Sequence, residues 1–117
     1  MVRRMPDPVR GEIWTVDSDP TRGHEQAGKR PALVLSTDLF NEGPAGLVIV
    51  LPVTRKVKGI PFHVAIDPPE GGVKIRSLIK CDDIRSVATE RVSKRWGSVS
   101  QATLDAVEDR VRVLLDL

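Results

Sequence analysis

The sequence has 117 residues and a mass of 12.9 kDa, a length that favours one domain spanning residues 1–117. Hydrophobic residues make up 40% and charged residues 29%, which excludes a disordered chain, and no apolar run is long enough to cross a bilayer. Lysine and arginine total 18 against 16 acidic residues, so a polyanion would have to be bound by a local patch rather than by the whole molecule.

The first half of the chain predicts three strands. Residues 11–16 alternate between apolar and polar side chains and indicate a first strand, which a long polar loop over 17–29 follows. Residues 31–36 form a short apolar run, and Thr37 is placed to cap one helical turn that ends at Asn41. Residues 47–53 are the most apolar segment and indicate a central, buried strand.

The second half predicts further short strands and a closing helix. A second polar loop covers 54–59, a strand 62–66, a turn 67–72, an alternating strand 73–79 and a last short strand 84–87. Apolar residues then recur at helical spacing from Leu104 to Leu114. Ser100 is a suitable N-cap, and Val99 and Leu104 occupy the positions of a hydrophobic staple. Five or more short strands with one terminal amphipathic helix indicate a mainly β protein, a small and strongly curved sheet or barrel.

Metal and thiol chemistry are not expected. His24, His63 and Cys81 are isolated in the sequence, and Asp82 and Asp83 are expected on opposite sides of a strand, where they chelate poorly. We therefore predict no metal and no cofactor. His63 is expected to be a surface residue of its strand, and Cys81 a small buried or half-buried thiol. A single cysteine and the lack of a secretion signal favour a cytoplasmic protein without a membrane segment.

The two polar loops carry most of the candidate chemistry. Each lies next to an apolar strand, and cations on neighbouring loops would attract a phosphodiester, whose oxygens arginine binds in pairs. The alternative, that these are solvated loop charges, is left open by composition alone. Four aromatic residues in all, with no tyrosine, argue against a surface that stacks successive bases. The candidate side chains are Arg22, His24, Glu25, Gln26, Lys29 and Arg30 in the first loop, and Thr54, Arg55, Lys56 and Lys58 in the second.

Three blocks of the sequence resemble the MazF/PemK family of toxins. The first is the segment 10–36, which contains G-H-E-Q-A-G-K-R-P at residues 23–31 in the place of the family's G-x-E-Q-x-G-x-R-P. The second is G-L-V-I-V-L-P-V-T at 46–54 followed by K-G-I-P-F at 58–62, and the third is C-D-D-I-R-S-V at 81–87. The resemblance covers nearly the whole chain. His24 and Asp83 depart from it, since serine and glutamine are usual there.

The resemblance implies a fold and an activity. The fold would be an SH3-like small barrel of the PemK/CcdB type, and the protein a homodimeric toxin of a type II toxin–antitoxin system. Its activity would be metal-independent endoribonuclease cleavage of single-stranded RNA at short sequences, with a role in growth regulation and a cognate antitoxin protein as partner. Whether messenger, transfer or ribosomal RNA is the target stays open, although the family includes mRNA interferases. The substrate's own 2′-OH would attack phosphorus and leave 2′,3′-cyclic phosphate and 5′-OH ends.

The resemblance also assigns roles to residues. Arg30 takes the place of the family's catalytic arginine, Thr54 that of its threonine, and Glu25 that of an assisting glutamate. An arginine is well suited to stabilise charge on the phosphate but is a poor base, so Glu25 and His24 both remain candidates for removing the 2′-OH proton. Two other functions stay open: a CcdB-like toxin that inhibits DNA gyrase without cleavage, and an inactive RNA-binding module.

Overall fold

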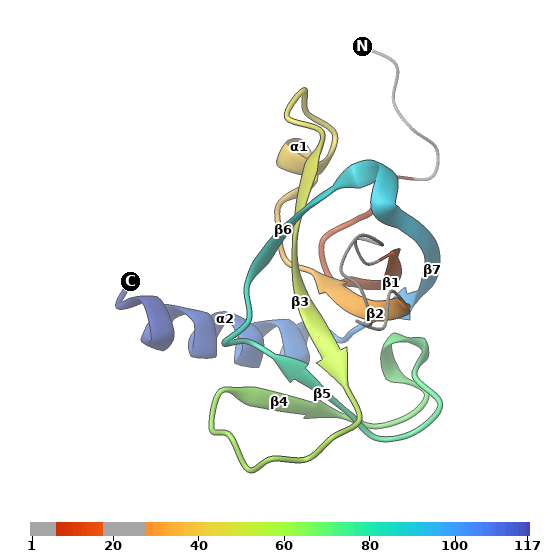
Figure 1. Ribbon diagram of the computed structural model, residues 1–117. Coiled ribbons are helices and arrows are strands. Elements are labelled where there is room, and N and C mark those ends of the chain that lie inside the picture. Colours follow the sequence, from red (N-terminus) through yellow and green to blue (C-terminus); the bar gives the residue numbers. More distant parts are fainter. Residues whose placement is uncertain (1–6, 18–27) are drawn as a thin grey trace.

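The computed structural model describes residues 7–17 and 28–117, and over these residues seven strands form one curved antiparallel sheet (Figure 1). The helical elements are α1 (Asp38–Asn41), α2 (Gln101–Leu115) and two short 3₁₀ turns, η1 (Glu70–Gly72) and η2 (Thr89–Arg91). The strands are β1 (Glu12–Asp17), β2 (Lys29–Val34), β3 (Leu47–Thr54), β4 (His63–Ile66), β5 (Ser77–Lys80), β6 (Arg85–Ala88) and β7 (Val92–Ser98).

The strand order explains the curvature. The strands follow the path β4-β5-β3-β2-β1-β7, and β6 pairs with β3 beside that path. β3 pairs with β6 along its first half and with β5 at its end, so the sheet turns a corner on this strand. Within the described residues β4 and β7, the two ends of the path, do not pair, so the barrel-like sheet is open. The prediction of a small, mainly β fold with a C-terminal helix is confirmed.

Apolar side chains are buried on both faces of the sheet. In β3, Leu51 and Val53 point into the larger core, which also contains Val107 of α2. Val48 and Val50 alternate with them and point into a smaller core that contains Trp14 of β1. Burial on both faces is the reason that residues 47–53 form a nearly continuous apolar run.

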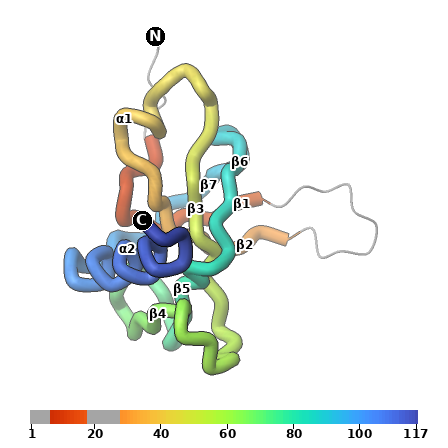
Figure 2. Tube along the Cα trace, turned by 90° about the vertical axis from the view of Figure 1, so that its left-hand side faces the viewer, coloured from red at the N-terminus to blue at the C-terminus, as the bar shows by residue number. Residues whose placement is uncertain are grey.

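Helix α2 covers one face of the sheet. It lies behind β3 and β5 in Figure 1 and to the left of β3 in Figure 2, and it buries Leu104 and Val107. The backbone N–H of Thr103 donates to the Ser100 hydroxyl at 3.1 Å, which confirms the predicted N-cap. Leu114 is 37% exposed, so only the first half of the predicted apolar stripe is buried. In the described part of the chain, no helix has the length and apolar character needed to span a membrane.

Two predictions about the second half of the chain are wrong in detail, and one strand was missed. The strand expected over 73–79 is confined to Ser77–Lys80, because the glycine turn at η1 leads into an exposed segment in which Ile75 is 47% exposed. Asp82 and Asp83 lie in a turn closed by the bond from the Asp83 N–H to the Lys80 carbonyl, rather than on a strand. The strand β7, which pairs with β1, was not predicted.

Candidate functional site

Pairing between β2 and β3 brings Arg30 and Thr54 to the same place. Ala32 lies opposite Pro52, and Arg30 and Thr54 are each two residues further toward the same end of the pair. Because side chains two apart on a strand share a face, all four belong to the face that is opposite Leu51, Val53 and α2. Arg30 and Thr54, separated by 24 positions in the chain, therefore line one groove.

The Thr54 hydroxyl is held in position by the loop that follows it. The backbone N–H of Lys56 donates to Thr54 Oγ1 at 3.1 Å, where the strand ends. Because the hydroxyl oxygen accepts this bond, the hydroxyl proton remains available for donation to a ligand. Arg30 is an exposed residue of β2, next to Lys29 and opposite Val16 of β1. The pair therefore presents a guanidinium and one hydroxyl donor from two strands of a fixed sheet.

The groove is strongly basic although the whole chain has a net charge of only +2. It is open, with a volume of about 1600 Å³. Among its described lining residues the single acidic side chain is Asp17. The basic side chains that line it are Lys29, Arg30, Arg55, Lys56, Lys58, Lys74, Lys80, Arg85, Arg91, Lys94 and Arg95. The small excess of positive charge is therefore concentrated on the face opposite α2.

Three of these cations are occupied by acidic partners. Arg95 pairs with Glu12 at 2.6 Å, and Arg85 binds both carboxylate oxygens of Asp83 at 2.9 Å. Lys80 lies 3.6 Å from the same carboxylate. The hydrogen bond from Arg85 is the main reason that the pKa of Asp83 lies below its usual value, and it raises the pKa of Arg85. The added negative charge of Asp83 is thus neutralised within the protein by two cations.

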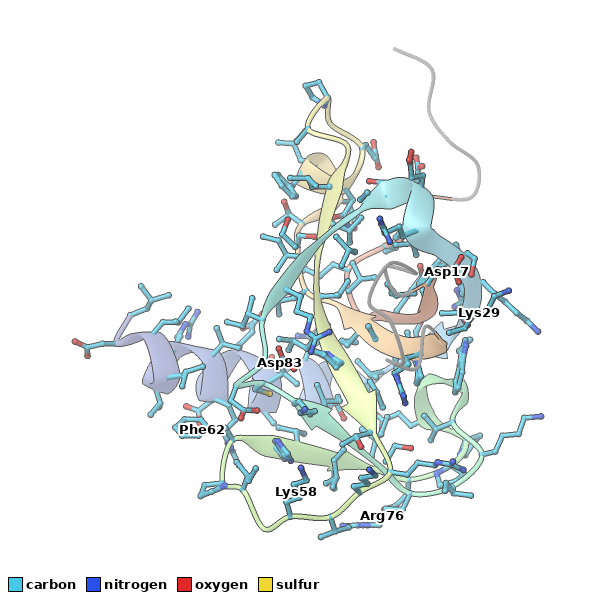
Figure 3. The ribbon with its side chains drawn as sticks, in the orientation of Figure 1. Asp17, Lys29, Lys58, Phe62, Arg76 and Asp83 are labelled. Carbon is cyan, nitrogen blue, oxygen red and sulfur yellow. The ribbon has the colours of Figure 1, made fainter. Side chains whose placement is uncertain are left out.

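The other basic lining residues have no acidic partner in residues 7–17 and 28–117. In Figure 3 Lys29 lies beside Asp17 at the ends of β1 and β2, and Lys58 lies toward the lower edge of the view. Of the predicted site residues, the structure brings Lys29, Arg30, Thr54, Arg55, Lys56 and Lys58 together in this groove. Arg22, His24, Glu25 and Gln26 lie outside the described residues.

His63 differs from its prediction as a surface residue. Its side chain is only 3% exposed, and its Nε2 lies 3.2 Å from Oδ1 of Asp82. His63 points to the groove face because Val64 and Ile66, which alternate with it, belong to the core below α2. The Asp82 turn brings its carboxylate close to this imidazole, a long-range contact that the sequence did not indicate.

Several lining residues were not predicted. Lys74 follows the η1 turn, and Arg91, Lys94 and Trp96 belong to η2 and β7. The basic and aromatic run K-R-W at 94–96 is the signal that could have indicated them. Asp17 was also missed, and its Oδ1 is buried without a hydrogen-bond partner in the described part of the chain.

Cys81 is buried, as predicted, and it is a poor nucleophile. Burial raises the pKa of its thiol to about 11. Within the described ranges, no three histidine, cysteine or acidic side chains converge as a set that could hold a metal ion.

Comparison with known proteins links this chain to one family. The model of the family described as "PemK-like, MazF-like toxin of type II toxin-antitoxin system" matches residues 9–115. Endoribonuclease MazF9 of Mycobacterium tuberculosis is 39% identical over 113 residues, which cover 92% of this chain and 96% of the relative. The endoribonuclease toxin MazF of Escherichia coli K12 is 36% identical over 110 residues, covering 92% and 94%.

Solved structures agree with the sequence comparison. A crystal structure of MazF from Deinococcus radiodurans has a TM-score of 0.78 at 32% identity, covering 95% of this chain and 98% of the other. A crystal structure of MazE–MazF from the same organism has a TM-score of 0.82 at 33% identity, covering 94% and 96%.

Proposed function

This chain belongs to the family of PemK-like, MazF-like toxins of type II toxin–antitoxin systems, and from that membership we propose that it is an endoribonuclease that cuts single-stranded RNA. The observation that carries the proposal is the convergence of Arg30 and Thr54 in a groove whose described lining is almost wholly basic. Such a groove attracts the sugar–phosphate backbone, and two fixed donors can act on one phosphate within it.

The proposed reaction is an internal transfer of a phosphodiester. The 2′ oxygen of one nucleotide forms a bond to the adjacent phosphorus while the bond from phosphorus to the 5′ oxygen of the next nucleotide breaks. The 2′-OH loses its proton and the departing 5′ oxygen gains one, so no water is consumed and the ends are a 2′,3′-cyclic phosphate and a 5′-OH. Because the nucleophile belongs to the substrate, the reaction does not require a metal-activated water.

Arg30 and Thr54 are assigned to the phosphate. Negative charge on the non-bridging oxygens increases as the 2′ oxygen attacks, and the Arg30 guanidinium stabilises it by charge-assisted hydrogen bonds. Thr54 adds one more donor, its oxygen being fixed by the Lys56 N–H. Lys29, Arg55, Lys56 and Lys58, together with Arg22, His24 and Gln26, would bind the neighbouring backbone.

The proton acceptor is proposed among three side chains. Glu25 and His24 are the sequence candidates. Asp17 is a third, because it lines the groove and pairs across the sheet with Lys29, the residue next to Arg30 on β2. Three variants separate them: Glu25→Gln, His24→Asn and Asp17→Asn. The dependence of cleavage rate on pH is measured for each. The acidic limb of the profile should disappear in the variant that lacks the base and persist in the other two.

The decisive experiment is the mapping of RNA ends. The purified protein is incubated with a long single-stranded RNA in EDTA, and the 5′-OH ends are sequenced. We expect cuts at a short recurring sequence and a loss of roughly 100- to 1000-fold in rate for Arg30→Ala, the size found when one preorganised donor to a transition state is removed. Arg112→Ala, on the exposed side of α2, is the matched control and should cut normally.

Three results would contradict parts of this proposal. RNA that stays intact at high protein concentration would refute the nuclease, and inhibition of DNA gyrase by such a preparation would favour the non-cleaving toxin. Cleavage that survives Arg30→Ala would refute the site, and cleavage abolished by EDTA would refute the metal-free reaction.

We further propose that the toxin acts in the cytoplasm as a homodimer and binds a cognate antitoxin, in line with the MazE–MazF structures. Relief of growth arrest by co-expression of the product of an adjacent gene would test the last point.

A further inference from the structure

Trp96 stands in a special position on the wall of the groove. In the pairing of β7 with β1, Gly97 lies opposite Ile13 and Arg95 lies opposite Trp14, so Trp96 is an extra residue without a register partner. Such a β-bulge redirects a side chain from its regular alternation. Here the redirected side chain is a large aromatic one, and it lines the groove.

The indole of Trp96 is fixed in place by two neighbours. Its Nε1–H donates to the Thr15 hydroxyl at 2.7 Å, so the single polar group of the ring is satisfied inside the protein. The η1 turn packs against its backbone: a Cβ added to Gly72 would lie 2.3 Å from the Trp96 carbonyl oxygen. The side chain is nevertheless 37% exposed, whereas Trp14 is 2% exposed. Trp96 therefore presents a rigid apolar ring whose orientation is already set.

Cations line the groove into which this ring is exposed. Lys74, Arg91 and Lys94 line this groove, as Trp96 does, and have no acidic partner among the described residues. Arg95, by contrast, is held by Glu12 and the Ser98 hydroxyl and serves the wall itself. A fixed aromatic face in a groove lined by cations suits RNA, because one base can stack on the ring while the phosphates bind the cations.

We propose that Trp96 is a stacking platform for one base of the RNA and thereby positions the strand for cleavage, an inference that rests on the nuclease function proposed above. Arg30 and Val92 both lie opposite Val16 across β1. Trp96 is four residues beyond Val92, but two register shifts in β7 place it between the positions opposite Trp14 and Ile13, two to three residues from Val16 along β1. Two strand spacings and about three residue rises place Trp96 roughly 14 Å from Arg30. Trp96 therefore stacks on a base that flanks the cleaved bond. This is a single platform, consistent with the small number of aromatic residues.

The test measures binding separately from chemistry. The probe is an oligonucleotide that contains the mapped cleavage sequence with a 2′-deoxy sugar at the cleaved bond, so that it binds but is not cut. We expect Trp96→Ala to weaken its binding by about 5- to 150-fold, the range that one base–aromatic stack supports, and Trp96→Phe to keep much of the affinity. Leu39→Ala, which removes an 85% exposed apolar side chain outside the groove, is the matched control and should bind normally.

Abasic probes identify the stacked base. Each position of the oligonucleotide is replaced in turn by an abasic sugar. At one position the abasic sugar should weaken binding to the wild-type protein as much as Trp96→Ala does. The same abasic sugar should not weaken binding further in the Trp96→Ala variant, because both changes remove the same contact. The wild-type fluorescence should also be quenched on binding, and the quenching should be absent in Trp96→Phe, since the remaining Trp14 is buried.

The outcomes separate this inference from the proposed function. If the wild type neither binds nor cuts RNA, the nuclease proposal itself fails. If the wild type binds and Trp96→Ala binds equally well, the platform is refuted and the nuclease stands. The same holds if the loss of affinity from each abasic position simply adds to the loss from Trp96→Ala. A loss of affinity that accompanies a lower mass in size-exclusion chromatography would refute the platform too, because Trp96 would then be a contact between copies of the chain.

Discussion

Replacing Gly72 by alanine tests how the groove wall is held together. The backbone of Gly72 has φ +80°, in the left-handed region that favours glycine. A Cβ at this position would lie 2.3 Å from the carbonyl oxygen and 2.6 Å from the carbonyl carbon of Trp96. Both neighbours are backbone atoms of β7, so a change of rotamer cannot relieve the overlap. We expect the η1 turn to separate from β7 and the free energy of unfolding to fall.

The expected loss has two parts. A non-glycine residue in the left-handed region costs about 1–2 kcal/mol. Relieving an overlap with packed atoms costs typically about 1–3 kcal/mol more. The lower entropy of the unfolded alanine chain offsets less than about 1 kcal/mol. The sum is a destabilisation of roughly 1–5 kcal/mol, against the 5–15 kcal/mol that is common for a small domain.

Urea unfolding with two control variants separates these parts. Gly59→Ala and Gly46→Ala have φ +65° and +68°, and an added Cβ meets no atom within 4 Å at either position. They therefore report the conformational cost alone and should lose about 1 kcal/mol. Gly72→Ala must exceed both by the cost of the overlap. Equal unfolding free energies for all three variants, at equal m-values, would show that the contact between η1 and β7 is not tight and would refute the reasoning.

Three further predictions concern charge and reactivity. Burial opposes ionisation of Glu70, but hydrogen bonds from Thr103 and Ser100 outweigh it and lower its pKa below 4.5. The stability that this carboxylate contributes is therefore present above pH 4.5 and lost as the pH falls through the folded pKa, so Glu70→Gln should be destabilised at pH 7 and converge with the wild type at acid pH in urea titrations. With a pKa of about 11, about one Cys81 thiol in a thousand is ionised at pH 8, and iodoacetamide should alkylate it rapidly only in unfolding urea, as mass spectrometry would show. Lys56→Gln should lower the slope of log affinity for RNA against log salt by about 0.7, the value for one lost contact with a single-stranded phosphate, and an unchanged slope would place Lys56 outside the interface.

Most strands that the sequence predicted have buried residues, and β6, predicted at 84–87, is the exception. β3 is apolar over nearly its whole length because both its faces are buried. β7 has only Val92 fully buried, and it is a strand because β1 pairs with it, which is a long-range effect. In 73–79 the alternation was misleading, since Lys74, Ile75 and Arg76 follow the positive-φ glycines of η1 and stay exposed. Alternation alone therefore does not establish a strand.

The candidate site was predicted as far as local motifs reach. Arg30 and Thr54 each belong to a recognisable segment, and the pairing of β2 with β3 brings these segments together. Lys94 and Trp96 come from the far end of the chain, and only the sheet topology places them on the same groove. His63 was misplaced for a similar reason, because its burial depends on the turn that carries Asp82.

The pairing of the first strand with the last has a consequence for the time at which this toxin becomes active. Glu12 binds Arg95 across 83 positions of the chain, and Trp96 donates to Thr15 across 81. The wall that carries Trp96 is thus synthesised long after β1, the strand on which it docks. A polypeptide whose translation stops before residue 92 leaves that edge of β1 unpaired and lacks one side of the groove. We therefore expect that a chain released before β7 has been made cannot cut RNA.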